Sequence, residues 1–233
     1  IDDREPARAT IDAAGWRLWG GKLLSIGAAE AGAVIITAET DDGPAAFLIA
    51  REALAMKAYP TIDGRRAADV MLDDVTAPNA ARLAVESEDI TEILDLGAAA
   101  IAAEAAAIMA RLVADTRDYC VQREQFGNAI ASFQVVQHRL VDMHIEARRA
   151  AAAAALAVDA LDLDGTERSK AISAAKVTIA DAGRFVGQNA VQLHGGMGMT
   201  EELPVSALFK RLTVIESEFG TRDEHLARYM ALT

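Results

Sequence analysis

The sequence predicts an α+β fold: a small antiparallel β-sandwich or barrel followed by an up-down four-helix bundle. Residues 1–85 contain short β-forming segments separated by turn residues, a pattern typical of a small sheet. From about Glu88 onward, long stretches without proline place apolar residues three and four positions apart, which is typical of packed helices. We therefore predict a β-domain at residues 1–85 and a helical domain at 86–233.

The composition restricts the class of protein. The chain has 233 residues, 52% of them hydrophobic, enough to bury one large core or two small ones. Its net charge of −12 predicts a surface that repels nucleic acid and anionic membranes. The absence of an apolar run of about 20 residues predicts no membrane span, and the single Cys120 predicts a reducing compartment. Because the chain begins at Ile1 rather than methionine, we expect a fragment or a processed product.

In the first half, the clearest turn is Asp41-Asp42-Gly43, because Asp and Gly tolerate the positive φ of a tight hairpin. The predicted strands cover residues 16–19, 23–25, 33–38, 46–50, 54–58 and 67–75.

In the second half, we predict four helices. The first covers residues 90–122, the second begins after residue 128, the third begins after a capping residue in Asp164-Gly165-Thr166, and the last covers residues 222–231. The first is so rich in alanine that burial on several faces is expected. The second and third should pack antiparallel. Their predicted core stripes are Phe133, Val136, Leu140, Met143, Ala147 and Ala151, and Ile172, Ala175, Ile179, Ala182, Val186, Ala190 and Leu193.

A first candidate segment runs from Arg123 to Gly127 and continues to Phe133 and Gln134. Gly127 suits the left-handed C-cap of the first long helix, which would hold Arg123 at the turn between two helices. The guanidinium could bind a phosphate bidentately, or it could cap helix carbonyls.

A second candidate segment, Gln192 to Thr200, has three glycines within four positions. Such a backbone can approach a ligand without Cβ interference, or it can simply end a helix. No strand precedes it, so it is not a dinucleotide fingerprint. We interpret His194 as a packed or capping residue rather than a base. The four histidines form no HExxH pair, which predicts no metal site.

A third candidate segment, Glu216 to His225, precedes the last helix. Thr221 can cap that helix, whose first N–H groups would suit a phosphate or a flavin pyrimidine oxygen. A solvated acidic turn is the alternative.

These three segments, in this order after a small β-domain, resemble the acyl-CoA dehydrogenase family over nearly the whole chain. The chain resembles that family's middle β-domain without its first part, joined to the complete C-terminal helical domain. The most specific matches are Arg123-Glu124-Gln125-Phe126-Gly127 with Phe133-Gln134, and Gln192 to Gly198 with Glu202-Leu203-Pro204-Val205.

The resemblance implies an FAD-dependent oxidoreductase that acts on acyl-CoA, forms homo- or hetero-oligomeric dimers or tetramers, and passes electrons to an electron-transferring flavoprotein. In that family a glutamate removes the α-proton while the β-hydride passes to the flavin, because a polarised thioester allows a carboxylate to act as base. The resemblance also leads us to expect that the protein is located in the cytoplasm of a bacterium. The implied FAD-contacting residues are Arg123, Phe126, Phe133 and Gln134, then Gln192, Gly195 and Gly196 toward a neighbouring subunit, and Thr221 at the flavin.

The sequence departs from the family at the catalytic base. The commonest base position, immediately before the Gly-Thr pair, holds Phe219, and the alternative position on the first long helix holds Gly97. Glu218 is a candidate substitute, but an offset of one residue turns its side chain away from the pocket. Glu104 occupies a position where relatives carry a non-catalytic glutamate.

Two further departures affect the pocket. The family's flavin-stacking Trp-Ile-Thr/Ser run corresponds to Lys22 to Gly27, where only Ser25 keeps a hydroxyl. The family's N-terminal helical domain has no counterpart in these residues, so they cannot build a complete acyl-CoA site.

We therefore expect one subunit of a larger assembly, whose partner supplies the missing base and pocket wall. A non-catalytic scaffold and an acyl-CoA oxidase are the alternatives. The segment from Glu218 to Arg228 is similar to bacterial members that act on bulky acyl-CoAs such as those with steroid side chains.

Overall fold

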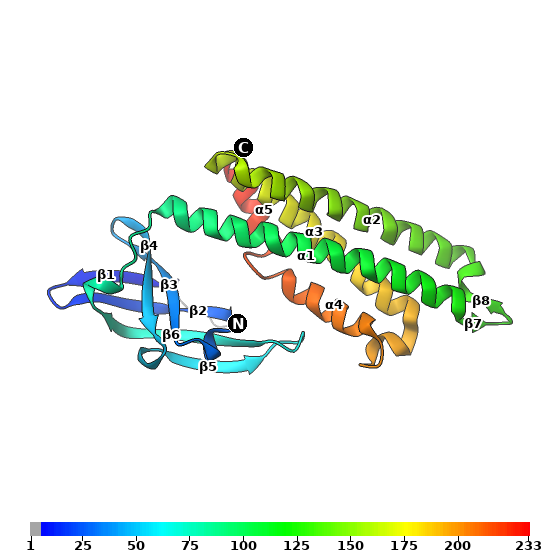
Figure 1. The fold of residues 1–233 in the computed structure, drawn as a ribbon, viewed down its shortest axis with the longest axis horizontal. Helices are drawn as coiled ribbons and strands as arrows, with labels where there is room; N and C mark the ends of the chain where they lie inside the picture. The colour runs from blue at the N-terminus through cyan, green and yellow to red at the C-terminus, as the bar shows by residue number, and fades with distance from the viewer. Residues whose placement is uncertain (1–5) are drawn as a thin grey trace. The chain divides into compact units, whose positions relative to one another are not determined.

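The computed structural model describes residues 6–233. The chain divides into two compact units, Ile1–Glu92 and Ile93–Thr233, each with its own hydrophobic core. The first unit is a sheet and the second is a set of helices, so the α+β class is confirmed (Figure 1).

The first unit contains one six-stranded sheet in the order β4-β3-β1-β2-β6-β5. Its strands are β1 (Arg8–Asp12), β2 (Gly15–Ile26), β3 (Ala33–Thr40), β4 (Gly43–Ala50), β5 (Ala55–Pro60) and β6 (Arg66–Ala77). Neighbouring strands are antiparallel except β1 and β3, which run parallel. The prediction of an antiparallel sheet is therefore wrong at β1, a strand that the sequence interpretation missed.

Turn chemistry positions two parts of this sheet. β3 and β4 form the predicted hairpin, with Thr40 opposite Gly43 and φ of 104° at Gly43. The Gly20-Gly21 pair, which falls between the predicted strands 16–19 and 23–25, lies inside β2, where the register against β6 shifts between Leu18 and Gly20. A second shift follows between Lys22 and Ser25. Such bulges allow one long strand to cover a stretch in which the sequence pattern predicts two separate strands.

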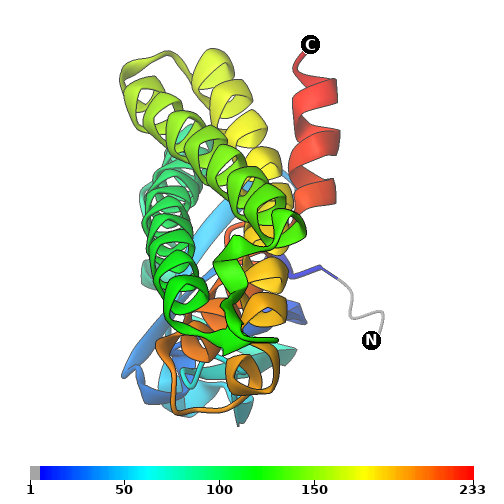
Figure 2. The same cartoon turned by 90° about the vertical axis from the view of Figure 1, so that its right-hand side faces the viewer.

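The second unit contains five helices rather than the predicted four. They are α1 (Ser87–Gln122), which begins in the first unit, α2 (Gln134–Asp159), α3 (Gly165–His194), α4 (Pro204–Ile215) and α5 (Arg222–Ala231). A short hairpin of β7 (Glu124–Gln125) and β8 (Asn128–Ala129) joins α1 to α2. Figures 1 and 2 show α5 beside α3.

The missed helix, α4, begins with Pro204 at its first position, where proline is favoured. It packs closely on α3 because a glycine leaves room: a Cβ built on Gly187 would lie 2.9 Å from Cδ2 of Phe209. The apolar spacing of Val205, Leu212 and Ile215, all buried, could have revealed it from the sequence.

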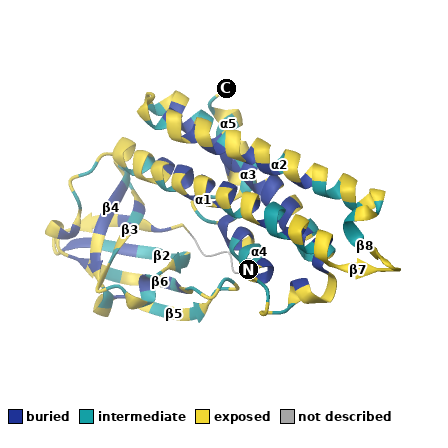
Figure 3. Ribbon diagram, turned by 45° about the vertical axis from the view of Figure 1, so that its right-hand side comes forward, coloured by how far each residue is buried: buried dark blue, intermediate teal, exposed yellow. Residues whose placement is uncertain are grey.

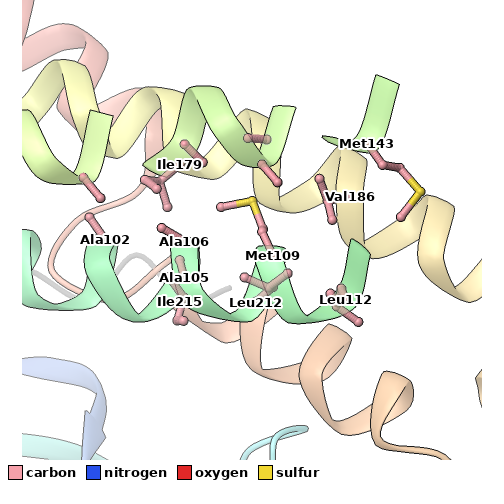
Figure 4. Close-up of a cluster of buried hydrophobic side chains, with 14 of the residues drawn as sticks. Ala102, Ala105, Ala106, Met109, Leu112, Met143, Ile179, Val186, Leu212 and Ile215 are labelled. Carbon is pink, nitrogen blue, oxygen red and sulfur yellow. The ribbon is translucent and has the colours of Figure 1, made fainter. Parts of the chain in front are cut away.

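The core of the helical unit lies between α1, α2, α3 and α4 (Figure 4). Its labelled side chains are Ala102, Ala105, Ala106, Met109, Leu112, Met143, Ile179, Val186, Leu212 and Ile215. Five alanines of α1 are buried, whereas Ala100, Ala103, Ala107 and Ala110 are exposed; the α3 stripe from Ile172 to Ala190 is buried as predicted. In α2 the stripe departs from prediction, since Ala151 is exposed and Ala150 and Ala154 are buried instead. The predicted cap is confirmed: Asp164 accepts a hydrogen bond from the Glu167 N–H at 3.3 Å.

By length and composition, α1 could cross a membrane, contrary to the prediction of no such segment. Half of its most apolar window is buried inside the structure. Ala98, Ala102 and Met109 on this helix are essentially inaccessible to solvent. Burial of this kind is what a core helix of a bundle requires.

Candidate functional site

The first candidate segment forms an exposed hairpin at one end of the helical unit (Figure 3). The loop residues Phe126 and Gly127 have φ of 54° and 77°. Gly127 is therefore left-handed as predicted, but the prediction that it caps the helix is wrong, because α1 ends at Gln122 and Gly127 turns the hairpin. Phe126 is 91% exposed, and its ring meets Phe133 edge-on with centroids 6.3 Å apart. A large aromatic residue held at positive φ and in solvent suggests a contact surface.

The polar members of this segment are also accessible. Arg123 follows the last residue of α1, and its N–H donates to the Tyr119 carbonyl at 2.8 Å. Gln134 is the first residue of α2. Both side chains are exposed, so the guanidinium and the amide are free to bind an added group.

The second candidate segment lies at the same end of the helical unit. Its connection to the first is Tyr119, whose hydroxyl donates to the His194 carbonyl at 3.3 Å and whose ring stacks on His194 with centroids 4.3 Å apart. The His194 ring is buried, with Nδ1 2.8 Å from the Ala190 carbonyl. The interpretation of His194 as a packed residue is confirmed.

The glycines of this segment have different roles. A Cβ built on Gly195 or Gly196 would meet no described atom within 4 Å, whereas one on Gly198 would lie 2.7 Å from the Val191 carbonyl oxygen. Gly198 is thus required by packing, while Gly195 and Gly196 leave their backbone open to a ligand, beside the exposed Gln192.

The third candidate segment contains the predicted cap. The Thr221 hydroxyl accepts from the Glu224 N–H at 3.3 Å, and the Thr221 N–H donates to Glu224 Oε2 at 2.7 Å. The hydrogen bond from the Thr221 N–H and, to a smaller extent, the one from the Thr221 hydroxyl lower the pKa of Glu224. The Thr221 hydroxyl also donates to Glu224 Oε2 at 2.9 Å.

The three segments form two groups within one chain. Arg222, next to Thr221, donates to Asp181 of α3 at 2.7 Å. Between Asp181 and His194 the axis of α3 advances about 20 Å. Thr221 is therefore far from Arg123 and the open glycines, and one flavin ring cannot touch both groups of a single chain.

The two positions that the resemblance assigns to the base lie against each other. A Cβ on Gly97 would overlap the Phe219 ring, with Cδ1 and Cζ at 2.6 Å. The Phe219 ring therefore fills the space beside α1 that a glutamate side chain at position 97 or 219 would occupy. Phe219 has φ of 54°, and its side chain is about half exposed.

Both substitute glutamates are bound by one arginine. Arg211 donates from Nη1 to Glu218 at 3.0 Å and from Nε to Glu104 at 2.6 Å. A carboxylate with its lone pairs directed at a guanidinium is held in place by strong hydrogen bonds. This pairing argues against Glu218 or Glu104 acting as the base.

Sequence reasoning missed a buried polar cluster. Asp95 of α1 is inaccessible, and it accepts from Ser169 at 2.7 Å and from Arg228 at 2.6 Å. Lys176 and His225 are also buried. Lys176 lies between Ile172 and Ile179 in the apolar stripe of α3. A charged residue in a core stripe is the sequence signal that could have revealed this cluster. No group of residues suited to a metal ion occurs in residues 6–233.

Comparison with known proteins identifies the family. A family model described as the C-terminal domain of acyl-CoA dehydrogenase matches residues 88–231. The chain belongs to the acyl-CoA dehydrogenase family. Acyl-CoA dehydrogenase FadE34 of Mycobacterium tuberculosis is 36% identical over 162 residues, which cover 66% of this chain and 23% of FadE34.

Two solved structures are similar to this acyl-CoA dehydrogenase-family chain over both units. The ChsE4-ChsE5 complex from Mycobacterium tuberculosis matches with a TM-score of 0.88 and 26% identity, covering 99% of this chain and 63% of that chain. The Tcur3481-Tcur3483 steroid ACAD matches with a TM-score of 0.86 and 28% identity, covering 98% of this chain and 62% of that one. The chain thus spans about a quarter of FadE34 and less than two thirds of each of these structures.

Proposed function

We propose that this chain is a flavin-binding part of an acyl-CoA dehydrogenase-type assembly whose catalytic carboxylate comes from a partner chain. The reaction is the α,β-dehydrogenation of an acyl-CoA thioester. The observation that carries the proposal is the open backbone at Gly195 and Gly196, at the same end of the helical unit as the exposed Arg123 and Phe126.

The residues of that end suit FAD, which when bound supplies the hydride acceptor. Arg123 would hold the diphosphate, because a planar guanidinium binds such oxygens bidentately. Phe126 and Phe133 would cover an apolar face of the cofactor, and Gln134 and Gln192 offer amide donors. The open glycines let the backbone approach the cofactor closely.

Thr221 belongs to a different flavin from the one at Arg123 of the same chain. The separation of about 20 Å along α3 supports sites that are shared between subunits. In such an assembly Thr221 would donate to a flavin while its backbone stays in the capping box of α5. The similarity to the ChsE4-ChsE5 complex supports a partner chain, and an electron-transferring flavoprotein is the proposed acceptor.

The acyl-CoA substrate is proposed to be bulky. The segment from Glu218 to Arg228 is similar to members that act on such thioesters, and the Tcur3481-Tcur3483 protein is a steroid ACAD. Phe219 places an apolar ring where a smaller carboxylate would otherwise stand, which favours contact with a hydrophobic acyl group.

Flavin uptake tests the proposal. The purified full-length protein, alone or with its partner chain, should take up FAD and show visible flavin absorbance. Gly196→Leu should weaken FAD binding by roughly tenfold or more, because the side chain fills open space needed by the ligand. The matched control is Gly32→Leu, another glycine with open surroundings. Protein that stays colourless with any partner would contradict the proposal.

A second candidate function is a non-catalytic scaffold of such a complex. The contact between Phe219 and Gly97 favours it, since neither residue can accept a proton. Dehydrogenation of several acyl-CoAs with an artificial electron acceptor separates the two functions. A scaffold would bind neither FAD nor thioester, whereas the proposed flavoprotein binds FAD and turns over with its partner.

A further inference from the structure

The turn between α4 and α5 has a backbone conformation that Phe219 does not favour. Phe219 and Gly220 have consecutive positive φ angles of 54° and 103°. A bulky residue in this region is strained, and such strain persists only where surrounding groups fix it. Gly220 is confined as well, because a Cβ there would lie 2.8 Å from Nε2 of His225.

A buried lysine from α3 binds one side of this turn. Lys176 is 1% exposed, and its ammonium donates to the carbonyls of Ile215 at 3.1 Å and Glu218 at 2.6 Å. Burial lowers the pKa of Lys176 to about 8, partly opposed by the charge of Glu216. Desolvating a cation costs free energy, which the hydrogen bonds to these two carbonyls must offset.

A buried histidine from α5 binds the other side. His225 Nε2 lies 2.8 Å from the Phe219 carbonyl, and Nδ1 lies 3.2 Å from the Ser173 hydroxyl. Burial is the largest cause of a lowered pKa for His225, which favours the neutral ring. Since a carbonyl only accepts, Nε2 carries the proton and Nδ1 accepts from Ser173.

We propose that Lys176 and His225 are positioning residues that fix the turn carrying Phe219 and Thr221. Together they bind three carbonyls, those of Ile215, Glu218 and Phe219. These bonds hold the Phe219 ring against Gly97 and set the start of α5. The inference that this turn affects cofactor binding rests on the proposed function, whereas the inference that Lys176 and His225 fix the turn does not.

Hydrogen exchange of the turn tests this proposal. In Lys176→Met, amides in a peptide covering residues 216–224 should exchange about tenfold faster or more, because bonds from a charged donor are among the stronger ones. Core peptides of α1 and α2 should keep their protection. Lys210→Met is the matched control, since Lys210 lies on α4 and pairs at the surface with Glu201. It should leave the turn unchanged.

Two further measurements keep the test decisive. His225→Phe preserves an aromatic ring but removes the donor to Phe219, and it should accelerate exchange in the same peptide. In FAD-loaded full-length protein, Lys176→Met should raise the dissociation constant for FAD about tenfold, while Lys210→Met should not. Unchanged turn exchange in both Lys176→Met and His225→Phe would overturn the proposal, and so would a uniform loss of protection across the unit. If the wild-type protein binds no FAD, the proposed function fails, and the exchange experiment still decides the role of these residues.

Discussion

The packing of Phe219 on Gly97 predicts a specific energetic coupling. In an exposed helix interior, replacing glycine with alanine stabilises the fold by about 1 kcal/mol. At Gly97 the new methyl would overlap the Phe219 ring, with two ring carbons at 2.6 Å, well inside ordinary contact distance. Overpacking of this kind costs about 1–3 kcal/mol. Gly97→Ala should therefore lower the free energy of unfolding by about 0–2 kcal/mol.

The partner variant removes the obstruction. In a Phe219→Ala background the methyl at position 97 has space, so Gly97→Ala should stabilise the protein by about 1 kcal/mol. The coupling energy between the two sites is then about 1–3 kcal/mol.

Urea denaturation of the wild-type protein, the two single variants and the double variant measures this coupling. The cycle cancels the effect of Phe219→Ala on its own strained backbone. A gain of about 1 kcal/mol from Gly97→Ala in both backgrounds would refute the packing, and with it the conclusion that the ring fills the place of a base.

Three other changes test the buried interactions of the helical unit. The pKa of Lys176 is about 8 in the folded chain and 10.5 in the unfolded chain, so between these pH values the folded protein binds fewer protons than the unfolded one. The free energy of unfolding should therefore rise with pH in this range, by at most about 1.4 kcal/mol per pH unit. Denaturation from pH 7 to 10 should show this slope in the wild-type protein but not in Lys176→Met; equal slopes would contradict it. Gly220→Ala should cost about 1–3 kcal/mol, more than Gly64→Ala, because both have positive φ but only Gly220 faces the His225 ring; equal losses in thermal unfolding would refute that contact. Asp95→Ala should cost about 3–5 kcal/mol by leaving the guanidinium groups of Arg168 and Arg228 without their buried carboxylate, and a loss below about 1 kcal/mol in denaturant would disprove these pairings.

The sequence predicted the elements whose signals are local. The α3 stripe and its Asp164 cap follow from residue spacing and one side chain, and the structure has both. β1 was missed because its place depends on partners, β2 and β3, that lie elsewhere in the chain. α4 was missed because it lies between two segments interpreted for their chemistry.

The candidate site divides in the same way. Open glycines, the Thr221 cap and the packed His194 could be anticipated from residue type and position. The contact of Phe219 with Gly97 could not, since it joins residues more than 100 positions apart through packing. The carbonyl contacts of Lys176 depend equally on how α3 meets the turn after α4.

Anaerobic mixing of FAD-loaded protein with an acyl-CoA tests the central claim most directly. We expect the full-length chain to hold oxidised flavin and to leave its visible absorbance unchanged until the partner that carries the carboxylate is added, whereupon the absorbance should bleach. Bleaching of the full-length chain without a partner would contradict the account, as it would require a base that Phe219 and Gly97 cannot provide.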